Sequence, residues 1–268
     1  MEGFFLWYNL GVNNFKKNNM KKIILLICGI FILAGCNQQD TLEKNYKNEG
    51  KGQVKNNQTE EEYIIDENDY VNSKTLIQNI EKTDLSEKEK NGLILMREEE
   101  KLAHDVYTYL YEKWGQKTFD NISNSEQTHT DSVKTLLDNY SIDDPVKDNS
   151  IGKFTSLEMK ELYTKLILQG DKSLGDALSV GATVEDLDIK DLQDLLEITD
   201  NEDIRIVYQN LMKGSRNHLR AFIKQLEKNG KSYSVQYITN DEYKEIISSE
   251  QERGNLNSKG GRGMNSLR

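Results

Sequence analysis

Acidic and histidine side chains stand where a helix would normally bury leucine, and this pattern limits the folds open to the chain. Steps of three and four residues place seven side chains on one helical stripe: Phe119, Ile122, Glu126, His129, Val133, Leu136 and Tyr140. Near the C-terminus the same spacing joins Leu211, Ser215, His218 and Phe222. A buried ionisable group is costly unless it is paired or bound to a metal. The pattern therefore predicts a cation inside a bundle of helices.

The composition favours one mainly helical domain with flexible ends. Of the 268 residues, 30% are charged, 36% are hydrophobic and only one is proline, and alternating β-branched runs are scarce. The net charge of -10 argues against nucleic acid as a partner, because phosphate contacts need clustered lysine and arginine. The main basic cluster lies in the glycine-rich segment 251–268, which we expect to be a disordered tail.

The N-terminal part resembles a bacterial lipoprotein signal peptide. Met20 is followed by two lysines and an apolar run that is too short to span a bilayer comfortably. The run ends in Leu33-Ala34-Gly35-Cys36, which is similar to a lipobox. That resemblance implies a signal over residues 1–36, a mature chain that starts at Cys36, and lipidation of this cysteine. The protein would then be anchored by lipid in the cell envelope, outside the cytoplasm.

Two further points concern this N-terminal part. Residues 1–19 have no role in such a signal, so we expect translation to start at Met20. A signal anchor with a coincidental Cys36 is the alternative. Residues 37–70 are polar and predict a disordered tether, followed by a folded domain over 71–250.

The folded domain is predicted to be all-α. Capping signals at Ser86, at Asp200 or Asn201, and at Thr239 mark helix starts, and glycines mark ends. The expected helices cover residues 87–114, 119–140, 157–169, 174–198, 201–228 and a short segment after 239. The order is hairpin, long crossover, hairpin, which favours a ferritin-like four-helix bundle of two antiparallel hairpins with short extra helices.

Each hairpin is expected to direct acids and one histidine to the same interior. In the first helix Glu100 interrupts an apolar seam, with Glu99 on the adjacent row as an alternative. The third helix offers Glu185 and Asp188 on one face. Two divalent cations would balance the charge of Glu100, Glu126, Glu185 and Asp188. Mixed carboxylate and imidazole ligands suit two iron ions or manganese, and zinc less well.

Other interpretations of single residues stay open at this point. Ser123-x-x-Glu126 also matches a capping box, and His218 alone could be a hydrogen-bonded core histidine. Glu98 is expected to be solvated, and His104 to be partly exposed. Tyr107 fits ordinary core packing.

Two short segments resemble the ligand helices of rubrerythrins and ferritins. Glu100 is followed seven residues later by Tyr107, and Glu126-Gln127-Thr128-His129 is similar to their second-helix Glu-x-x-His. Four blocks between residues 85 and 247 resemble an uncharacterised prokaryotic ferritin-like family, a domain of unknown function: REEEKLAHDVY, SEQTHTDSV, VGATVEDLDI and GSRNHLRAF. The resemblance implies that Tyr107 lies beside the site as a catalytic candidate, and that the metal ligands are Glu100, Glu126, His129, Glu185 and His218.

The chain departs from the rubrerythrin pattern in the fourth helix. Ser215 stands where the second Glu-x-x-His would begin, and Asp188 is a candidate for the missing carboxylate. The chain also lacks the paired cysteines of a rubredoxin-like module.

The expected protein is a membrane-tethered, ferritin-like lipoprotein with a non-haem di-iron or manganese centre, active in iron, peroxide or oxygen chemistry. Whether it is an oxidase- or peroxidase-type oxidoreductase stays open. Its expected partners are metal ions and the membrane, and a homodimer is one assembly that it could form. The alternative is a non-catalytic helical lipoprotein that serves as a binding or structural module. Hydrolase signatures such as Gly-x-Ser-x-Gly are absent from the sequence.

Overall fold

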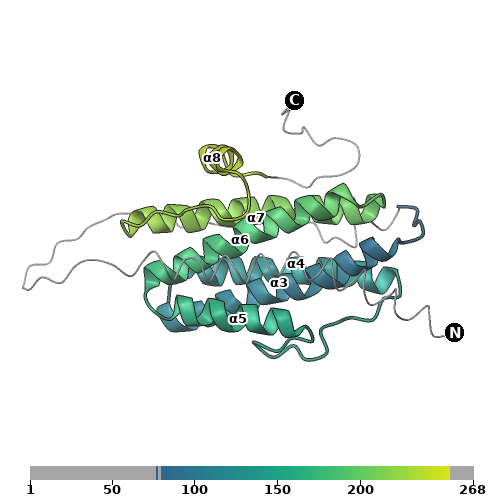
Figure 1. Ribbon diagram of the computed structural model, residues 1–268, viewed down its shortest axis with the longest axis horizontal. Helices are drawn as coiled ribbons and strands as arrows, with labels where there is room; N and C mark the ends of the chain where they lie inside the picture. Colours follow the sequence, from purple (N-terminus) through teal and green to yellow (C-terminus); the bar gives the residue numbers. More distant parts are fainter. Residues whose placement is uncertain (1–76, 78–79, 254–268) are drawn as a thin grey trace, which may run out of the picture. The chain divides into compact units, whose positions relative to one another are not determined.

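The computed structural model describes Ile77 and residues 80–253. Over residues 80–253 the chain forms six helices and no strand, as the all-α prediction requires. In chain order they are α3 (Glu87–Trp114), α4 (Lys117–Asn139), α5 (Leu157–Gly170), α6 (Leu174–Glu197), α7 (Glu202–Lys228) and α8 (Asn240–Ser248) (Figure 1). The predicted signal, lipobox and tether lie outside the described residues, as does most of the predicted tail.

The helix boundaries follow local capping chemistry. At the start of α3, the Ser86 hydroxyl accepts from the Glu89 amide (3.2 Å) and the Glu89 carboxylate accepts from the Ser86 amide (2.9 Å). Gly115 ends the helix with φ 65°, a left-handed conformation that suits glycine. Because α4 begins at Lys117, Ser123 lies inside the helix and is not its cap. The capping-box alternative for Glu126 is therefore wrong.

The long helices pack in pairs that face each other (Figure 1). Helix α3 packs against α4 after a two-residue connection, and α6 packs against α7. Helix α4 also contacts α7, and α3 contacts α6, while α5 packs on α3 and α6 and α8 packs on α7. No described helix combines the length and apolar character that a membrane span needs.

Two apolar groups flank the middle of these helices. Before Glu100 on α3 lies Met96, which belongs to a cluster with Val133 of α4 and Leu211 of α7. Beyond the middle, the rings of Tyr107, Phe119 and Phe222 pack with centroids 5.2 to 6.2 Å apart. The acids and histidines between these groups are thus enclosed by apolar side chains at both ends.

Buried acids also hold the connections between helices. Glu98 is only 4% exposed, and its carboxylate accepts from the backbone amides of Thr155 (2.6 Å) and Ser156 (3.0 Å) at the start of α5. The expectation that Glu98 is solvated is therefore wrong. Asp105 likewise accepts from the Gly152 amide (2.9 Å), so the α4–α5 connection is fixed to the outer side of α3.

Asp186 of α6 holds the segment between α7 and α8. It is fully buried and accepts from the Tyr233 hydroxyl (2.8 Å) and from three consecutive backbone amides, at 2.6, 3.2 and 3.0 Å: Gln236, Tyr237 and Ile238. Beyond α8, Glu252 pairs with Arg216 (2.5 Å) and Arg220 (3.0 Å) of α7.

Candidate metal centre

Five side chains from the four long helices converge between the two apolar groups. They form two trios, each with one ligand atom per residue within 4.8 Å of the others, and Glu126 belongs to both. The first trio adds Glu100 of α3 and His129 of α4, and the second adds Glu185 of α6 and His218 of α7. Each of the five residues is at most 2% exposed, so the cluster is closed to bulk water.

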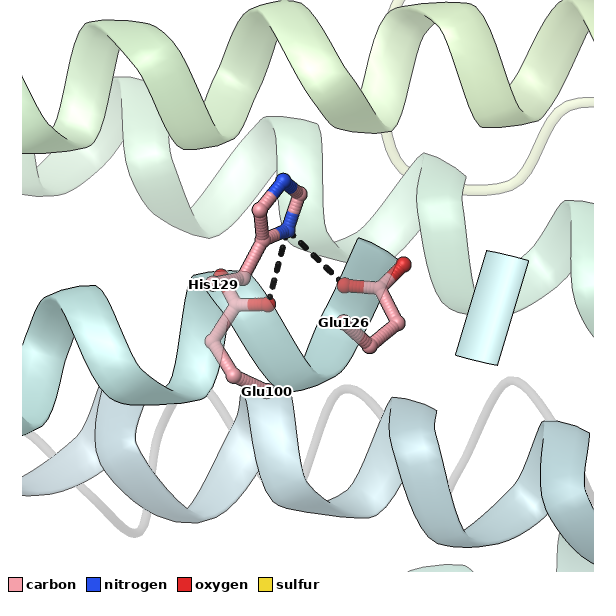
Figure 2. A group of neighbouring side chains, drawn as sticks. All are labelled: Glu100, Glu126 and His129. Carbon is pink, nitrogen blue, oxygen red and sulfur yellow. Dashed lines mark hydrogen bonds and ion pairs between the residues drawn. The ribbon is translucent and has the colours of Figure 1, made fainter. Parts of the chain in front are cut away.

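The first trio is built by one helix pair (Figure 2). Glu126 and His129 are three residues apart on α4 and therefore share a face. His129 Nδ1 lies 2.8 Å from Glu126 Oε2 and 3.2 Å from Glu100 Oε2, which reaches in from α3. Three potential ligand atoms thus surround one point, and the second oxygen of Glu100 is buried without a hydrogen-bond partner.

The second trio uses the other oxygen of Glu126. His218 Nδ1 lies 2.8 Å from Glu126 Oε1 and 3.5 Å from Glu185 Oε2. The 2.8 Å contact lacks hydrogen-bond alignment, so the two atoms are adjacent without being bonded to each other. The two imidazole rings stack with centroids 5.5 Å apart, and His218 Nε2 is 3.0 Å from the Ser125 hydroxyl. A hydrogen bond to the distal nitrogen is the usual way in which a metal-binding histidine is oriented.

Burial and the neighbouring charges shift the pKa values of the three carboxyl groups in the cluster. Burial raises the pKa of Glu100 to about 7, although His129 opposes the shift. Burial and the neighbouring Glu126 raise the pKa of Glu185. Burial acts on Glu126 in the same direction, but the charges of His218 and His129 outweigh it and lower that pKa.

The neighbouring carboxylates raise the pKa values of both histidines, His129 and His218. Burial alone would lower their pKa values, yet Glu126, together with Glu100 for His129 and Glu185 for His218, raises both well above the ordinary range. The balancing charge therefore comes from the imidazoles, and a bound cation would take over that role.

Tyr107 contacts the second trio directly. Its hydroxyl donates to Glu185 Oε1 (2.5 Å) and lies 3.3 Å from the Gly181 carbonyl oxygen. Burial, followed by the charge of Glu185, raises the Tyr107 pKa well above its usual value, so the phenol stays protonated. Gly181 leaves room for the neighbouring Phe222 ring, because a Cβ there would lie 2.5 Å from that ring.

The remaining predicted residues lie around the trios. Asp188 is half-buried, accepts from the Ser215 hydroxyl, and has its pKa raised well above normal by burial and then by Glu100. Glu99 lies on the adjacent side of α3 and faces Asp191 of α6. His104 points away, with its side chain 28% exposed and Nδ1 3.0 Å from Asp105.

Sequence reasoning missed Ser125 and Asp191. Ser125 precedes Glu126, and no helical stripe links it to His218, ninety-three positions away. Asp191 follows Asp188 by three residues on α6, and this spacing was the one signal that could have found it.

Comparison with known proteins identifies one relative that is similar in both sequence and structure. Over 178 residues the chain is 60% identical to "Uncharacterized protein MJ0754" of Methanocaldococcus jannaschii, a match that covers 66% of this chain and 96% of that protein. The crystal structure of hypothetical protein MJ0754 from Methanococcus jannaschii DSM 2661 matches with a TM-score of 0.64 and 60% identity, over 65% of this chain and 99% of that one. Residues 89–250 match the model of the uncharacterized protein domain DUF2202, and the chain therefore belongs to the DUF2202 family.

Proposed function

We propose that this protein is a ferritin-like metalloprotein whose four long helices form a bundle around two iron or manganese ions. The observation that carries the proposal is the position of Glu126, which turns one carboxylate oxygen toward each histidine. A carboxylate in that position can bridge two cations. Glu100 and His129 would complete one ion's protein ligands, and Glu185 and His218 the other's.

The donor atoms suit this assignment. Carboxylate oxygens and imidazole nitrogens are ligands that iron and manganese both accept. The unpartnered Glu100 oxygen and the unaligned contact between His218 and Glu126 are buried polar groups that hydrogen bonds leave unsatisfied. A cation in each trio would satisfy them.

The protein's own groups would control the chemistry at such a centre. Bound iron would supply one-electron redox chemistry and Lewis acidity, as in an oxidase- or peroxidase-type oxidoreductase. Tyr107 donates a hydrogen bond to Glu185 and would fix the orientation of that carboxylate. The apolar groups at both ends exclude water, and the Ser125 hydroxyl holds the His218 ring.

Asp188 belongs to the proposed centre as an additional carboxylate. Ser215 takes the position of a second-motif glutamate, and its hydroxyl donates to Asp188 instead. The support is electrostatic: the charge of Asp188 acts on Glu99 and Tyr107, and the charges of Glu100, Glu185 and Glu126 act on Asp188. Glu100 is preferred over Glu99 as the α3 ligand, because Glu100 belongs to a trio.

We further propose that the protein is a lipoprotein of the cell envelope, with Cys36 as the lipidated residue. The support is the order of charged start, apolar run and Leu33-Ala34-Gly35-Cys36 in the sequence. Mass spectrometry of the N-terminal peptide should show an acylated Cys36, and Cys36→Ala should move the protein from the membrane fraction to the soluble fraction. An unmodified Cys36 peptide from the membrane fraction would contradict the assignment.

Metal analysis tests the proposed centre. The full chain, purified in detergent and loaded anaerobically with Fe²⁺, should retain about two equivalents of iron after desalting, and its melting temperature should rise because the metal binds only the folded state. The Glu126→Ala/His129→Ala variant should retain none, whereas the exposed Glu112→Gln control should match the wild type. Loading that leaves no iron and no change in melting temperature would favour a metal-free binding or structural module.

A further inference from the structure

A second set of acids lies between α3 and α6, beside the metal centre. Glu99 is 7% exposed, Asp191 is 8% exposed and Asp188 is half-buried. Glu99 and Asp191 lie within hydrogen-bonding reach of each other, so two acidic groups meet in a nearly closed space. Neither residue belongs to the two trios that surround Glu126.

Among the described residues, the Asp191 carboxyl group is the one polar group within hydrogen-bonding reach of Glu99. Both carboxylate oxygens of Glu99 are buried without a hydrogen-bond donor. The Tyr208 hydroxyl, fully buried and influenced by the charge of Glu99, also has no partner. By contrast, Glu98, one residue earlier, accepts from two backbone amides. A buried acid whose one polar neighbour is another acid is an arrangement that a cation between the two would satisfy.

The acids connect the centre to solvent. Asp188 interacts electrostatically with Glu100 and Glu185 of the trios and also with Glu99. Glu99 lies next to Asp191, which interacts electrostatically with Asp194. The Asp194 side chain is 37% exposed and pairs with Lys190. Each member of the series Asp194, Asp191, Glu99 and Asp188 thus interacts with the next, from the partly exposed Asp194 to the neighbour of the trios.

We propose that Glu99, Asp191 and Asp188 form a transit site through which divalent cations reach the metal centre. This inference rests on the proposed function. Carboxylate oxygens bind hard divalent ions, and two or three such groups without imidazole would hold them weakly enough to pass them inward.

The rate of metal uptake tests the transit site. Co²⁺ is mixed with the metal-free full chain in a stopped-flow instrument, and the visible absorption of bound Co²⁺ is followed to completion. The Glu99→Gln/Asp191→Asn variant keeps the size of both side chains and removes their charge. We expect it to fill about tenfold more slowly than the wild type, in the range by which charged clefts change association rates. The final absorbance should match that of the wild type.

A matched control removes the same number of charges from the same helices. Glu112 of α3 and Glu197 of α6 are exposed, so Glu112→Gln/Glu197→Gln should fill at the wild-type rate. Circular dichroism melting checks the fold of each variant. If the double variant fails to fold, Glu99→Gln alone carries the test, with a smaller slowing.

The outcomes separate the transit site from the centre. A variant that fills at the wild-type rate would overturn the transit site and leave Glu99 and Asp191 as an acid pair that shares a proton. A lower final absorbance would also overturn it, because these residues would then be permanent ligands. If the wild type itself binds no Co²⁺, the proposed centre fails, and the transit site fails with it.

Discussion

Two kinds of buried acid lie close together on the same helices. On α3, Glu98 and Glu100 are two residues apart, and on α6, Glu185 and Asp186 are adjacent, and all four are at most 4% exposed. Glu98 and Asp186 face backbone amides of distant segments. Glu100 and Glu185 face histidines and other carboxylates.

This comparison shows that burial of an acid is not by itself a sign of a metal site. The anchoring acids, Glu98 and Asp186, have the donors that a carboxylate needs, so their burial stabilises the fold. Among the central acids, Glu100 and Glu126 each have one buried oxygen without a hydrogen-bond donor, and Glu185 lies next to Glu126 in the second trio. The two kinds differ in the direction in which the side chain leaves the helix axis. A step of one or two residues along the helix changes this direction from the bundle interior to a segment that packs on its outer side.

The largest expected effect comes from changing the shared central acid. Glu126→Gln should weaken the binding of both ions at least 100-fold, because the carboxylate that both trios share is replaced by a neutral amide, which would be a poor ligand for iron. Isothermal titration with Fe²⁺ under anaerobic conditions measures the loss. A variant that still binds two equivalents with wild-type affinity would remove the distinction between the two kinds of acid.

Asp186→Asn should lower the stability of the protein and leave its metal binding unchanged. One amide group cannot accept from Tyr233 and three backbone amides, so we expect the free energy of unfolding to fall by about 3 kcal/mol, while iron binding stays at the wild-type level. Guanidinium unfolding of the metal-free protein measures the change, with the exposed Glu197→Gln as a control. An unfolding curve that overlays the wild type would show that Asp186 is no anchor.

Glu98→Gln should give a smaller loss, of about 1 to 2 kcal/mol, since it accepts from two backbone amides at the edge of α5. Hydrogen exchange should quicken at the Thr155 and Ser156 amides and stay slow in the middle of α3. Uniformly faster exchange along α3 would contradict a local anchoring role.

The smallest effect is a difference in pH dependence. The pKa of Glu100 is raised to about 7 from 4.5, so the folded metal-free protein binds this proton more tightly than the unfolded chain does. Stability from Glu100 is therefore lost as the pH rises from about 4.5 to about 7. Glu89 behaves in reverse: burial would raise its pKa, but hydrogen bonds from Asn201 and Ser86 lower it, so its contribution is lost as the pH falls.

Urea unfolding at several pH values measures this difference. In the metal-free protein, Glu100→Gln should flatten the decline in unfolding free energy between about pH 4.5 and about pH 7. Bound metal should remove the decline as well, because it favours the ionised carboxylate. A decline that persists unchanged in Glu100→Gln would assign the dependence to another group.

Sequence periodicity was sufficient for the long helices and for the inward direction of Glu126, His129 and His218, because these features depend on spacing within one helix. Periodicity was insufficient to predict the burial of Glu98. The partners of Glu98 are Thr155 and Ser156, which lie in the connection between α4 and α5. The start of α7 shows the same limit. Asn201 occupies the cap position, but its side chain makes no cap bond, and the Glu89 carboxylate from α3 accepts from the Asn201 amide instead.

The division of the ligands between the helix pairs makes the two proposed ion positions unequal. Glu100, Glu126 and His129 all come from α3 and α4, which a two-residue link joins, so one hairpin supplies this whole position. The position between Glu126, Glu185 and His218 exists only after α6 and α7 have docked. An ion held there would act as a clamp across the two halves, so chelation should loosen the docking of α6 and α7 before it unravels the first hairpin.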